Sequence, residues 1–178
     1  MLRKTVDPFT CLKETIQILA RPGALLVTMG KREVPNVMAI GWGSVGIVWG
    51  KPVFVVLVRP SRYSFTLLKE RGQFTVNLPS PELSEVVAYC GSVSGREHDK
   101  FRETRLTPEA AETVAVPVIE ECRLTYECQV IATVDLLPEG LAPEVKSACY
   151  ARGDFHRVYY GEILRVTADP DFLSGMAR

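Results

Sequence analysis

The sequence has 178 residues, of which 47% are hydrophobic and 24% are charged, and its 21 basic residues balance its 21 acidic ones. These values are typical of one soluble globular domain and exclude a mainly disordered chain. The zero net charge argues against a general nucleic-acid binder, because such proteins carry a basic surplus.

The N-terminus and the apolar segments argue against secretion and against membrane insertion. The first residues lack the apolar run of a signal peptide. The longest uncharged run, residues 36–50, is too short and too rich in glycine to span a bilayer. Five irregularly spaced cysteines and two histidines favour neither a disulfide framework nor a zinc site. We therefore expect a cytoplasmic protein without a metal ion and without a membrane partner.

The first half of the chain alternates between apolar runs and breakers such as glycine and proline. Residues 1–20 are expected to form an N-terminal extension. The pattern then predicts a helix at 12–19, a buried strand at 24–29, a strand that leads into an irregular glycine-rich loop over 37–50, a buried strand at 53–58 and a helix at 62–71. Ser61 is a candidate N-cap of this last helix, and Gly72 ends it.

The second half adds two clear strands and several irregular segments. In order it predicts an alternating strand at 73–78, a helix at 80–91, a polar loop or short helix at 92–101, an acidic irregular segment at 102–121, a strand at 122–137, a loop with or without a short strand at 138–154, a strand at 156–168 and a C-terminal tail at 169–178. Even-numbered residues from Leu124 to Leu136 are expected to share one face. Long helices do not separate the strands, which disfavours a doubly wound parallel sheet. We predict a single, mainly β domain over 1–178, an antiparallel β-barrel with short helices.

The exit of the strand at 53–58 carries an unusual concentration of charge and hydroxyl groups. Arg59, Ser61, Arg62 and Ser64 stand at the start of the following helix. The free N–H groups and the dipole of a helix N-terminus favour a phosphate, and guanidinium groups add charge-assisted hydrogen bonds. The alternative is a capped surface helix with two solvated arginines. No Walker or Rossmann glycine motif is present to decide between them.

The glycine-rich strand is a second candidate for ligand binding. Its glycines permit close approach of the backbone to a flat ligand. Met38 and Trp42 offer apolar surface, while Asn36 and Ser44 offer polar contacts. The alternative is a tight barrel corner in which the glycines serve only the backbone geometry.

Three further places contain candidate residues. Ser94, Gly95 and Lys100 lie in a polar segment that could close over a ligand, although an exposed charged turn is the commoner case. Asn77 is on the polar face of its strand, where a turn role is the alternative. His156 precedes the last strong strand and could donate a hydrogen bond or a proton near neutral pH, unless a backbone carbonyl satisfies it.

Taken in order, six segments resemble one known family. They are PNVMAIGW, PVFVVLVRPSRYS, QFTVNLP, SGREHDKF, ECRLTYECQV and GDFHRVYYGEI. The chain is similar over residues 20–168 to the flavin reductase-like family of FMN-binding split-barrel proteins, and especially to its flavoredoxin-type branch. The resemblance implies a six-stranded antiparallel Greek-key split barrel, a homodimer, and FMN held without a covalent bond near the subunit interface.

The resemblance also implies roles for individual residues. The strand from Asn36 to Ser44 would run along the flavin ring, and the arginine-serine segment would take the phosphate. The implied cofactor-binding set is Asn36, Val37, Met38, Ala39, Trp42, Ser44, Arg59, Ser61, Arg62, Ser64, Asn77, Ser94, Gly95 and Lys100. His156 falls where the Gly-Asp-His motif of the family would place a nicotinamide contact.

Two departures from the family pattern bear on the reaction. The chain has MAIGWGS where reductases that supply free reduced flavin have a hydroxyl-rich loop, and Phe155 separates Asp154 from His156. Both favour an FMN-dependent oxidoreductase that exchanges electrons with a partner protein or a small molecule. The alternatives are an NAD(P)H:flavin oxidoreductase that feeds a monooxygenase, and a non-catalytic FMN-binding protein.

Overall fold

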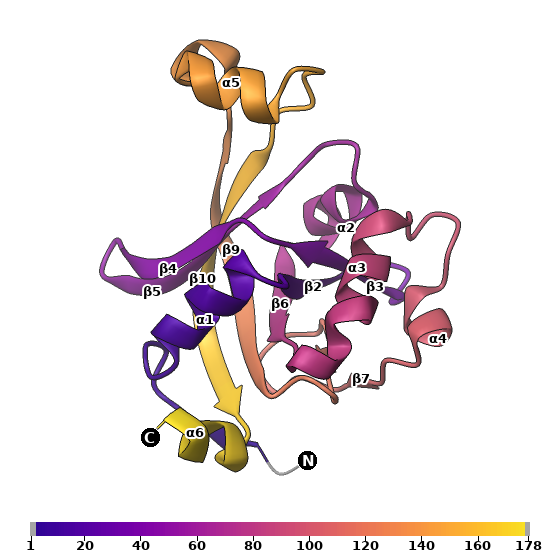
Figure 1. The fold of residues 1–178 in the computed structure, drawn as a ribbon, viewed down its shortest axis with the longest axis vertical. Coiled ribbons are helices and arrows are strands. Elements are labelled where there is room, and N and C mark those ends of the chain that lie inside the picture. Colours follow the sequence, from indigo (N-terminus) through magenta and orange to yellow (C-terminus); the bar gives the residue numbers. More distant parts are fainter. Residues whose placement is uncertain (1–2, 177–178) are drawn as a thin grey trace.

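The structure, a computed structural model, describes the backbone of residues 3–176 and the side chains of residues 3–173 (Figure 1). In chain order its elements are β1 (Lys4–Thr5), α1 (Leu12–Ala20), β2 (Ala24–Met29), β3 (Pro35–Ile40), β4 (Gly43–Val48), β5 (Lys51–Val58), α2 (Tyr63–Arg71), β6 (Gln73–Leu78), the 3-10 helix η1 (Pro81–Leu83), α3 (Ser84–Ser92), α4 (Lys100–Thr104), β7 (Pro108–Glu109), β8 (Val118–Ile119), β9 (Leu124–Asp135), the 3-10 helix η2 (Pro138–Gly140), α5 (Pro143–Cys149), β10 (Arg157–Ala168) and α6 (Pro170–Met176).

One antiparallel sheet makes up most of the molecule. Its strands follow the order β3-β2-β6-β9-β10-β5-β4, and β1 pairs with the end of β10. Within the described residues this sheet has eight strands, and β7 and β8 form a separate pair. The expected mainly β fold, an antiparallel split barrel with short helices, is confirmed. The sheet adds β1 and β4 to the six strands implied by the resemblance.

Two apolar clusters form the core, and β2 contributes to both. Leu26 belongs to the cluster inside the barrel, whereas Leu25 and Val27 belong to a cluster between the sheet and α3. Successive side chains of a strand point to opposite faces, so a strand that is covered on both sides must be apolar at consecutive positions. The run ALLVTM, which is apolar except for Thr28, therefore reflects the two apolar clusters that cover the two faces of β2.

The glycine-rich segment is more regular than we expected. Residues 43–48 form β4, which pairs along its whole length with β5, so the prediction of an irregular loop was wrong there. Gly43 permits this pairing, because an added Cβ would lie 2.7 Å from the carbonyl oxygen of Val55. The turn between the strands has left-handed backbone at Trp49 (φ 51°) and Gly50 (φ 73°), as a tight β-hairpin turn requires.

Two other expectations in the second half are corrected by the structure. The segment 138–154, expected to be a loop, contains α5. The even-numbered residues of β9 do not share one face along the whole strand. The pairing with β10 shifts register at Ile131, since Tyr160 faces Ala132 while Gly161 faces Val130. A β-bulge of this kind exchanges the two faces, and Val134 is consequently 51% exposed.

The start of α2 also differs from the sequence-based expectation. The N-cap position is Arg62, and no described side chain makes a capping hydrogen bond there. Ser61, the predicted cap, donates its hydroxyl hydrogen bond to Asp154. The helix ends as predicted at Gly72, whose φ of 70° is left-handed.

The N-terminal residues take part in the core. Cys11 and Leu19 are buried in the cluster inside the barrel, and the Thr15 hydroxyl lies 2.7 Å from the Tyr126 hydroxyl. At the other end of the molecule, the ends of β9 and β10 leave the barrel together and carry α5 at their tip (Figure 1). Among the described residues, no helix is long and apolar enough to cross a bilayer.

Candidate functional site

A cavity of about 330 Å³ lies where β3, the end of β5, the start of α2 and the segment after α3 meet. Its volume falls in the range of small-molecule sites. The cavity brings together most of the residues singled out from the sequence, although they come from four separate segments. The predicted residues that line it are Asn36, Met38, Ala39, Trp42, Arg59, Ser61, Arg62, Ser64, Ser94, Gly95, Lys100 and His156.

Three of the predicted residues do not line this cavity. Val37 is fully buried in the apolar cluster under α3, because it alternates with its neighbours along β3. Ser44 is exposed on β4. Asn77 is fully buried, where its side chain accepts a hydrogen bond from the Ile119 amide at 2.9 Å and donates one to the Leu25 carbonyl at 3.3 Å. Asn77 thus ties β6 to the segment that covers it.

The cavity also has lining residues that the sequence reasoning missed. They are Ile40, Gly41, Leu57, Tyr63, Cys90, Gly91 and Val93. Ile40, Gly41, Tyr63 and Val93 directly adjoin residues that had been singled out, and Leu57 lies two positions before Arg59, so the local segments already contained a signal for them. Cys90 and Gly91 stand at the end of α3 and reach the site only because α3 packs on β3. An added Cβ at Gly91 would lie 3.3 Å from the Cβ of Ala39, so this packing is close.

One end of the cavity is positively charged. Among the described residues that line the whole cavity, the charged ones are Arg59, Arg62 and Lys100, and none is acidic. Arg96 lies close by, where its guanidinium donates to the Ser61 carbonyl at 3.0 Å and stacks over the Tyr63 ring at 5.3 Å. Together with the start of α2, where no side chain forms a cap, these cations favour a bound anion.

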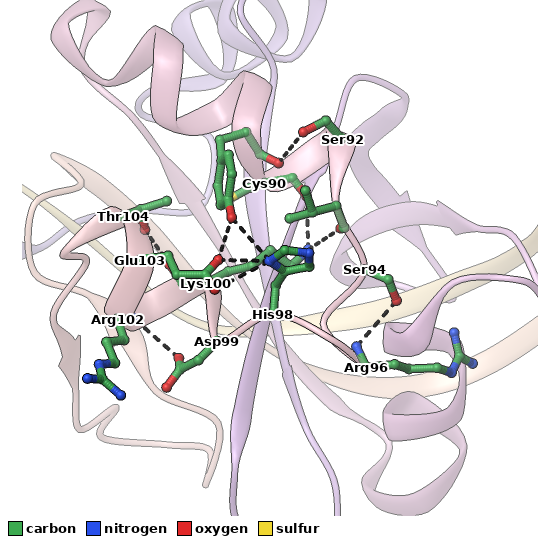
Figure 2. Close-up of polar contacts among 12 residues, drawn as sticks. Cys90, Ser92, Ser94, Arg96, His98, Asp99, Lys100, Arg102, Glu103 and Thr104 are labelled. Carbon is green, nitrogen blue, oxygen red and sulfur yellow. Dashed lines mark hydrogen bonds and ion pairs between the residues drawn. The ribbon is translucent and has the colours of Figure 1, made fainter.

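Lys100 also lines the cavity, and Figure 2 shows its contacts with the end of α3. Its side chain is buried, and Nζ donates to the carbonyls of Cys90 at 2.9 Å and Val93 at 3.1 Å. Burial lowers the pKa of Lys100; nearby Cys90 opposes this shift and Arg62 adds to it. Lys100 therefore caps the last carbonyls of α3 and contributes positive charge to the cavity from a fixed position.

The segment after α3 is held in place on both sides. His98 lies against Glu103, with its Nδ1 3.2 Å from Oε2, and Glu103 also accepts a hydrogen bond from the Tyr89 hydroxyl (Figure 2). On the other side, Gly95 lies so close to Asn36 that an added Cβ would overlap its side-chain oxygen. Glycine is thus required at this position by close packing.

Asn36 and Ser64 form a small polar network at the same end. The amide of Asn36 donates to the Ser64 hydroxyl oxygen at 2.9 Å, and the Thr28 hydroxyl donates to the same oxygen at 3.1 Å. Because this oxygen already accepts two hydrogen bonds, the Ser64 hydroxyl is left as a donor. A donor at this place suits an anionic or carbonyl ligand.

Arg59 and Ser61 are engaged with another part of the protein. The guanidinium of Arg59 donates to the carbonyls of Asp154 and Cys149, each at 2.9 Å. Asp154 accepts from the Ser61 hydroxyl at 2.6 Å and from the Ser61 amide at 3.2 Å. Both residues therefore fix the segment 149–156, which joins α5 to β10, to the wall of the cavity.

His156 also lines the cavity and is 8% exposed. Its Nδ1 lies 2.7 Å from the Tyr150 hydroxyl, and its ring centroid lies 5.2 Å from that of Trp42. Burial lowers the pKa of His156 to about 4, with a further lowering from Arg59 that Asp154 partly opposes. The imidazole is therefore neutral at neutral pH.

The thiols offer little further chemistry in the described residues. All five cysteines are free, and burial raises the pKa of Cys90, the one that lines the cavity, to about 11. Cys90 is thus a protonated thiol at neutral pH. Within the described part of the chain, histidine, cysteine, aspartate and glutamate form no group of three or more that could hold a metal ion.

Solved structures with the same fold include two flavoredoxins. The flavoredoxin of Desulfovibrio vulgaris (Miyazaki F) has 27% sequence identity and a TM-score of 0.68, covering 84% of this chain and 70% of that chain. The flavoredoxin from Methanosarcina acetivorans has 29% identity and a TM-score of 0.67, covering 84% and 69%. Nitrilotriacetate monooxygenase component B from Bacillus cereus, at 16% identity, shares the fold with a TM-score of 0.69 over 93% and 78% of the two chains.

Sequence comparison agrees with the structural likeness. An uncharacterized protein of Archaeoglobus fulgidus is 34% identical over 143 residues, which are 80% of this chain and 71% of that protein. The family model described as "Flavin reductase like domain" matches residues 17–175. This match spans every strand of the sheet except β1, and it includes the cavity and all its lining residues. The chain belongs to the flavin reductase-like family.

Proposed function

We propose that the protein binds FMN without a covalent bond in this cavity and acts as an FMN-dependent oxidoreductase of the flavoredoxin type. The observation that carries the proposal is the chemistry of the cavity itself. One wall is apolar and made largely by β3, while one end gathers cations at a helix start that no side chain caps. A flat ring system that ends in a phosphate has these same two properties.

The residues present fit this cofactor. Met38, Ile40 and Leu57 supply apolar surface for the ring, and Gly41 and Gly91 leave room beside it. We assign the phosphate to Arg62, the first-turn amides of α2 and the Ser64 hydroxyl, with Lys100 adding charge. Gly95 closes the segment over the same end.

This assignment divides the arginine-serine segment into two roles. The guanidinium of Arg62 forms no hydrogen bond or ion pair with any described residue and lines the cavity, so it is available to a phosphate. Arg59 and Ser61 already bind the segment 149–156. We infer that Arg59 and Ser61 shape the site and contribute less to phosphate binding than Arg62 does.

FMN supplies the redox chemistry when it is bound, because it takes up two electrons with a hydride and passes them on in pairs or singly. The chain's own residues bind and orient the cofactor and exclude water from one side of it. His156, as a neutral imidazole, can hold a hydrogen-bond acceptor near Trp42. The electron acceptor is a partner protein or a small molecule that reaches Trp42, whose side chain is 46% exposed.

A second candidate function is an NAD(P)H:flavin oxidoreductase. It is favoured by the position of His156, which lines the cavity beside Trp42 where a nicotinamide contact would be needed. Direct reduction by NADH is the property that distinguishes this candidate from a flavoredoxin-type electron carrier.

The proposal includes a homodimer. Large apolar side chains are exposed on the β4–β5 hairpin and on the projecting arm that β9, α5 and β10 form: Ile47, Trp49, Val134, Leu137 and Val145. Apolar side chains gathered on projecting elements are typical of a surface that another molecule covers. Light scattering on the purified protein at several concentrations tests this part, and a mass of one chain throughout would contradict it.

The first test of the function is an absorbance spectrum of the purified protein followed by anaerobic titration. We expect flavin bands near about 375 and 450 nm that bleach with a reduced carrier and only slowly with NADH. Rapid bleaching by NADH would support the reductase instead. A bound flavin that no biological reductant bleaches would indicate a non-catalytic protein, and failure of added FMN to bind would overturn the proposal.

A further inference from the structure

Tyr150 stands directly behind His156, on the side away from the cavity. It belongs to the segment 149–156 and is 5% exposed. Its hydroxyl lies 2.7 Å from Nδ1 of His156, and the two rings meet edge-on with centroids 5.5 Å apart. Because Nδ1 is engaged by Tyr150, Nε2 is the ring nitrogen that remains for the cavity.

The chemistry of the two groups decides which of them donates. A neutral imidazole carries one hydrogen, so one nitrogen donates and the other accepts. Burial raises the pKa of Tyr150, so its hydroxyl keeps its hydrogen. No other acceptor is hydrogen-bonded to this hydroxyl among the contacts of the described residues. The hydroxyl therefore donates to Nδ1, and the imidazole hydrogen stays on Nε2.

Two contacts with the Tyr150 ring hold it in position. The Phe155 ring stacks on it with centroids 4.9 Å apart and an interplanar angle of 20°. The Arg59 guanidinium lies 5.0 Å from the ring centroid, and it also donates to the carbonyls of Cys149 and Asp154 on either side of this segment. Phe155, which interrupts the family's Gly-Asp-His pattern, thus acquires a role as support for Tyr150.

We propose that Tyr150 is a positioning residue that holds His156 with its hydrogen on Nε2, so that the cavity presents a neutral hydrogen-bond donor beside Trp42. The group that fits this donor is a carbonyl-type oxygen on a planar, uncharged second substrate. The proposal rests on the proposed function where it names a second substrate, but the tautomer of His156 does not depend on a bound flavin. Ligands that offer only donors, such as ammonium groups, are disfavoured by the same arrangement and by Arg59 and Arg62 nearby.

The tautomer is measured on the full chain without cofactor. The protein has two histidines, so NMR of protein labelled with 15N in histidine gives two sets of imidazole nitrogen signals. The set that is lost in His98→Gln belongs to His98, and the remaining set belongs to His156. We expect an unprotonated Nδ1 and a protonated Nε2 for His156 at neutral pH. Tyr150→Phe keeps the ring and its stacking partners but removes the hydroxyl, and it should shift part of the population to the other tautomer.

A second readout concerns the ligand. With the FMN-loaded protein, we expect benzaldehyde to bind about fivefold more weakly to Tyr150→Phe than to the original protein, the effect of one neutral hydrogen bond. Toluene, which has the same ring without the oxygen, should bind both proteins equally, and the affinity for FMN should not change.

The outcomes separate the two proposals. If FMN fails to bind, the proposed function falls while the tautomer measurement still decides the role of Tyr150. A wild-type His156 with its hydrogen on Nδ1, or a tautomer that Tyr150→Phe leaves unchanged, overturns the inference. An equal loss of benzaldehyde and toluene would mean that Tyr150 supports only the shape of the cavity.

Discussion

The two ends of the cavity use similar residue types in opposite ways. At the α2 end, Arg62 and the first-turn amides face the cavity without protein partners that cap them. At the arm end, Arg59, Ser61, Tyr150 and His156 are bonded to one another or to the segment 149–156. Groups of the first kind are free to bind a ligand, whereas groups of the second kind fix the shape of the site.

The difference follows from the backbone hydrogen-bonding groups that each element leaves unpaired. A helix start leaves amide N–H groups without acceptors, and a nearby anion can accept hydrogen bonds from them. A segment that connects a projecting arm to a barrel strand must find partners for its own carbonyls, and Arg59 supplies them. We therefore propose that two arginines three positions apart in the sequence serve ligand binding and architecture respectively.

The largest expected effect concerns the arm end and its dependence on pH. The pKa of His156 is about 4 in the folded protein against 6.5 in the unfolded chain. Above pH 6.5 both states are neutral and His156 has no effect. Between pH 6.5 and 4 the unfolded chain binds a proton that the folded protein does not, so the free energy of unfolding should fall, by about 3 kcal/mol in total.

Urea unfolding at a series of pH values measures this effect. The carboxylates titrate in the same range, so the relevant quantity is the difference between the original protein and His156→Gln. His98→Gln is the matched control and should keep the full slope. Parallel pH profiles for the original protein and His156→Gln would show that the burial of His156 does not govern its ionisation.

The next effect concerns the α2 end. Arg62→Ala should weaken FMN binding by roughly 1.5–3 kcal/mol, because it removes a hydrogen bond to a charged phosphate. Riboflavin, which lacks the phosphate, should bind almost as before. Quenching of flavin fluorescence measures both affinities, and Arg102→Ala, at an exposed position on α4, is the control. An equal loss of affinity for FMN and riboflavin would mean that the phosphate does not bind at this end.

Arg59→Ala should have the opposite signature. It breaks hydrogen bonds to two carbonyls and the contact with the Tyr150 ring, so we expect the free energy of unfolding to fall by about 1.5 kcal/mol. FMN and riboflavin should then weaken together, because the shape of the site changes and the phosphate contact remains. If this variant lost affinity for FMN but not for riboflavin, Arg59 would bind the phosphate and the proposed difference between the two ends would be wrong.

Ser61→Ala should give the smallest change. Its hydroxyl donates to Asp154 at an exposed position, and we expect a loss of about 0.5–1 kcal/mol in stability. The affinity for FMN should stay within about twofold, an expectation that places Ser61 with Arg59 in the structural group. A tenfold loss of FMN affinity would mean instead that Ser61 contacts the ligand.

Much of the fold could be read from local patterns. The strand at 24–29 and the strand at 73–78 were predicted with the bounds that the structure has, and the helix at 62–71 differs by one residue. Uninterrupted apolar runs, strict alternation and a terminal glycine are local signals, because they depend on the period of each element and on one residue's backbone freedom. The grouping of the arginine-serine segment with the glycine-rich strand came from the family resemblance.

Other features depended on contacts between distant segments. β4 is a strand because β5 pairs with it, although its glycines alone favour a loop. The faces of β9 exchange at Ile131 because β10 has one residue fewer at that point. Neither effect leaves a trace in the local sequence, since each depends on the partner strand.

For this protein, the sequence by itself determined the period of its main strands, the helix start with its cations and the residue types of an anion site. The tertiary structure decided which of those groups are available. Arg59 and Asp154 are 95 positions apart, and only folding brings the carbonyl of one to the guanidinium of the other. The physical reason is that a guanidinium donates to whichever acceptors the fold brings within reach, so its partners are chosen by tertiary contacts and not by its neighbours in the chain.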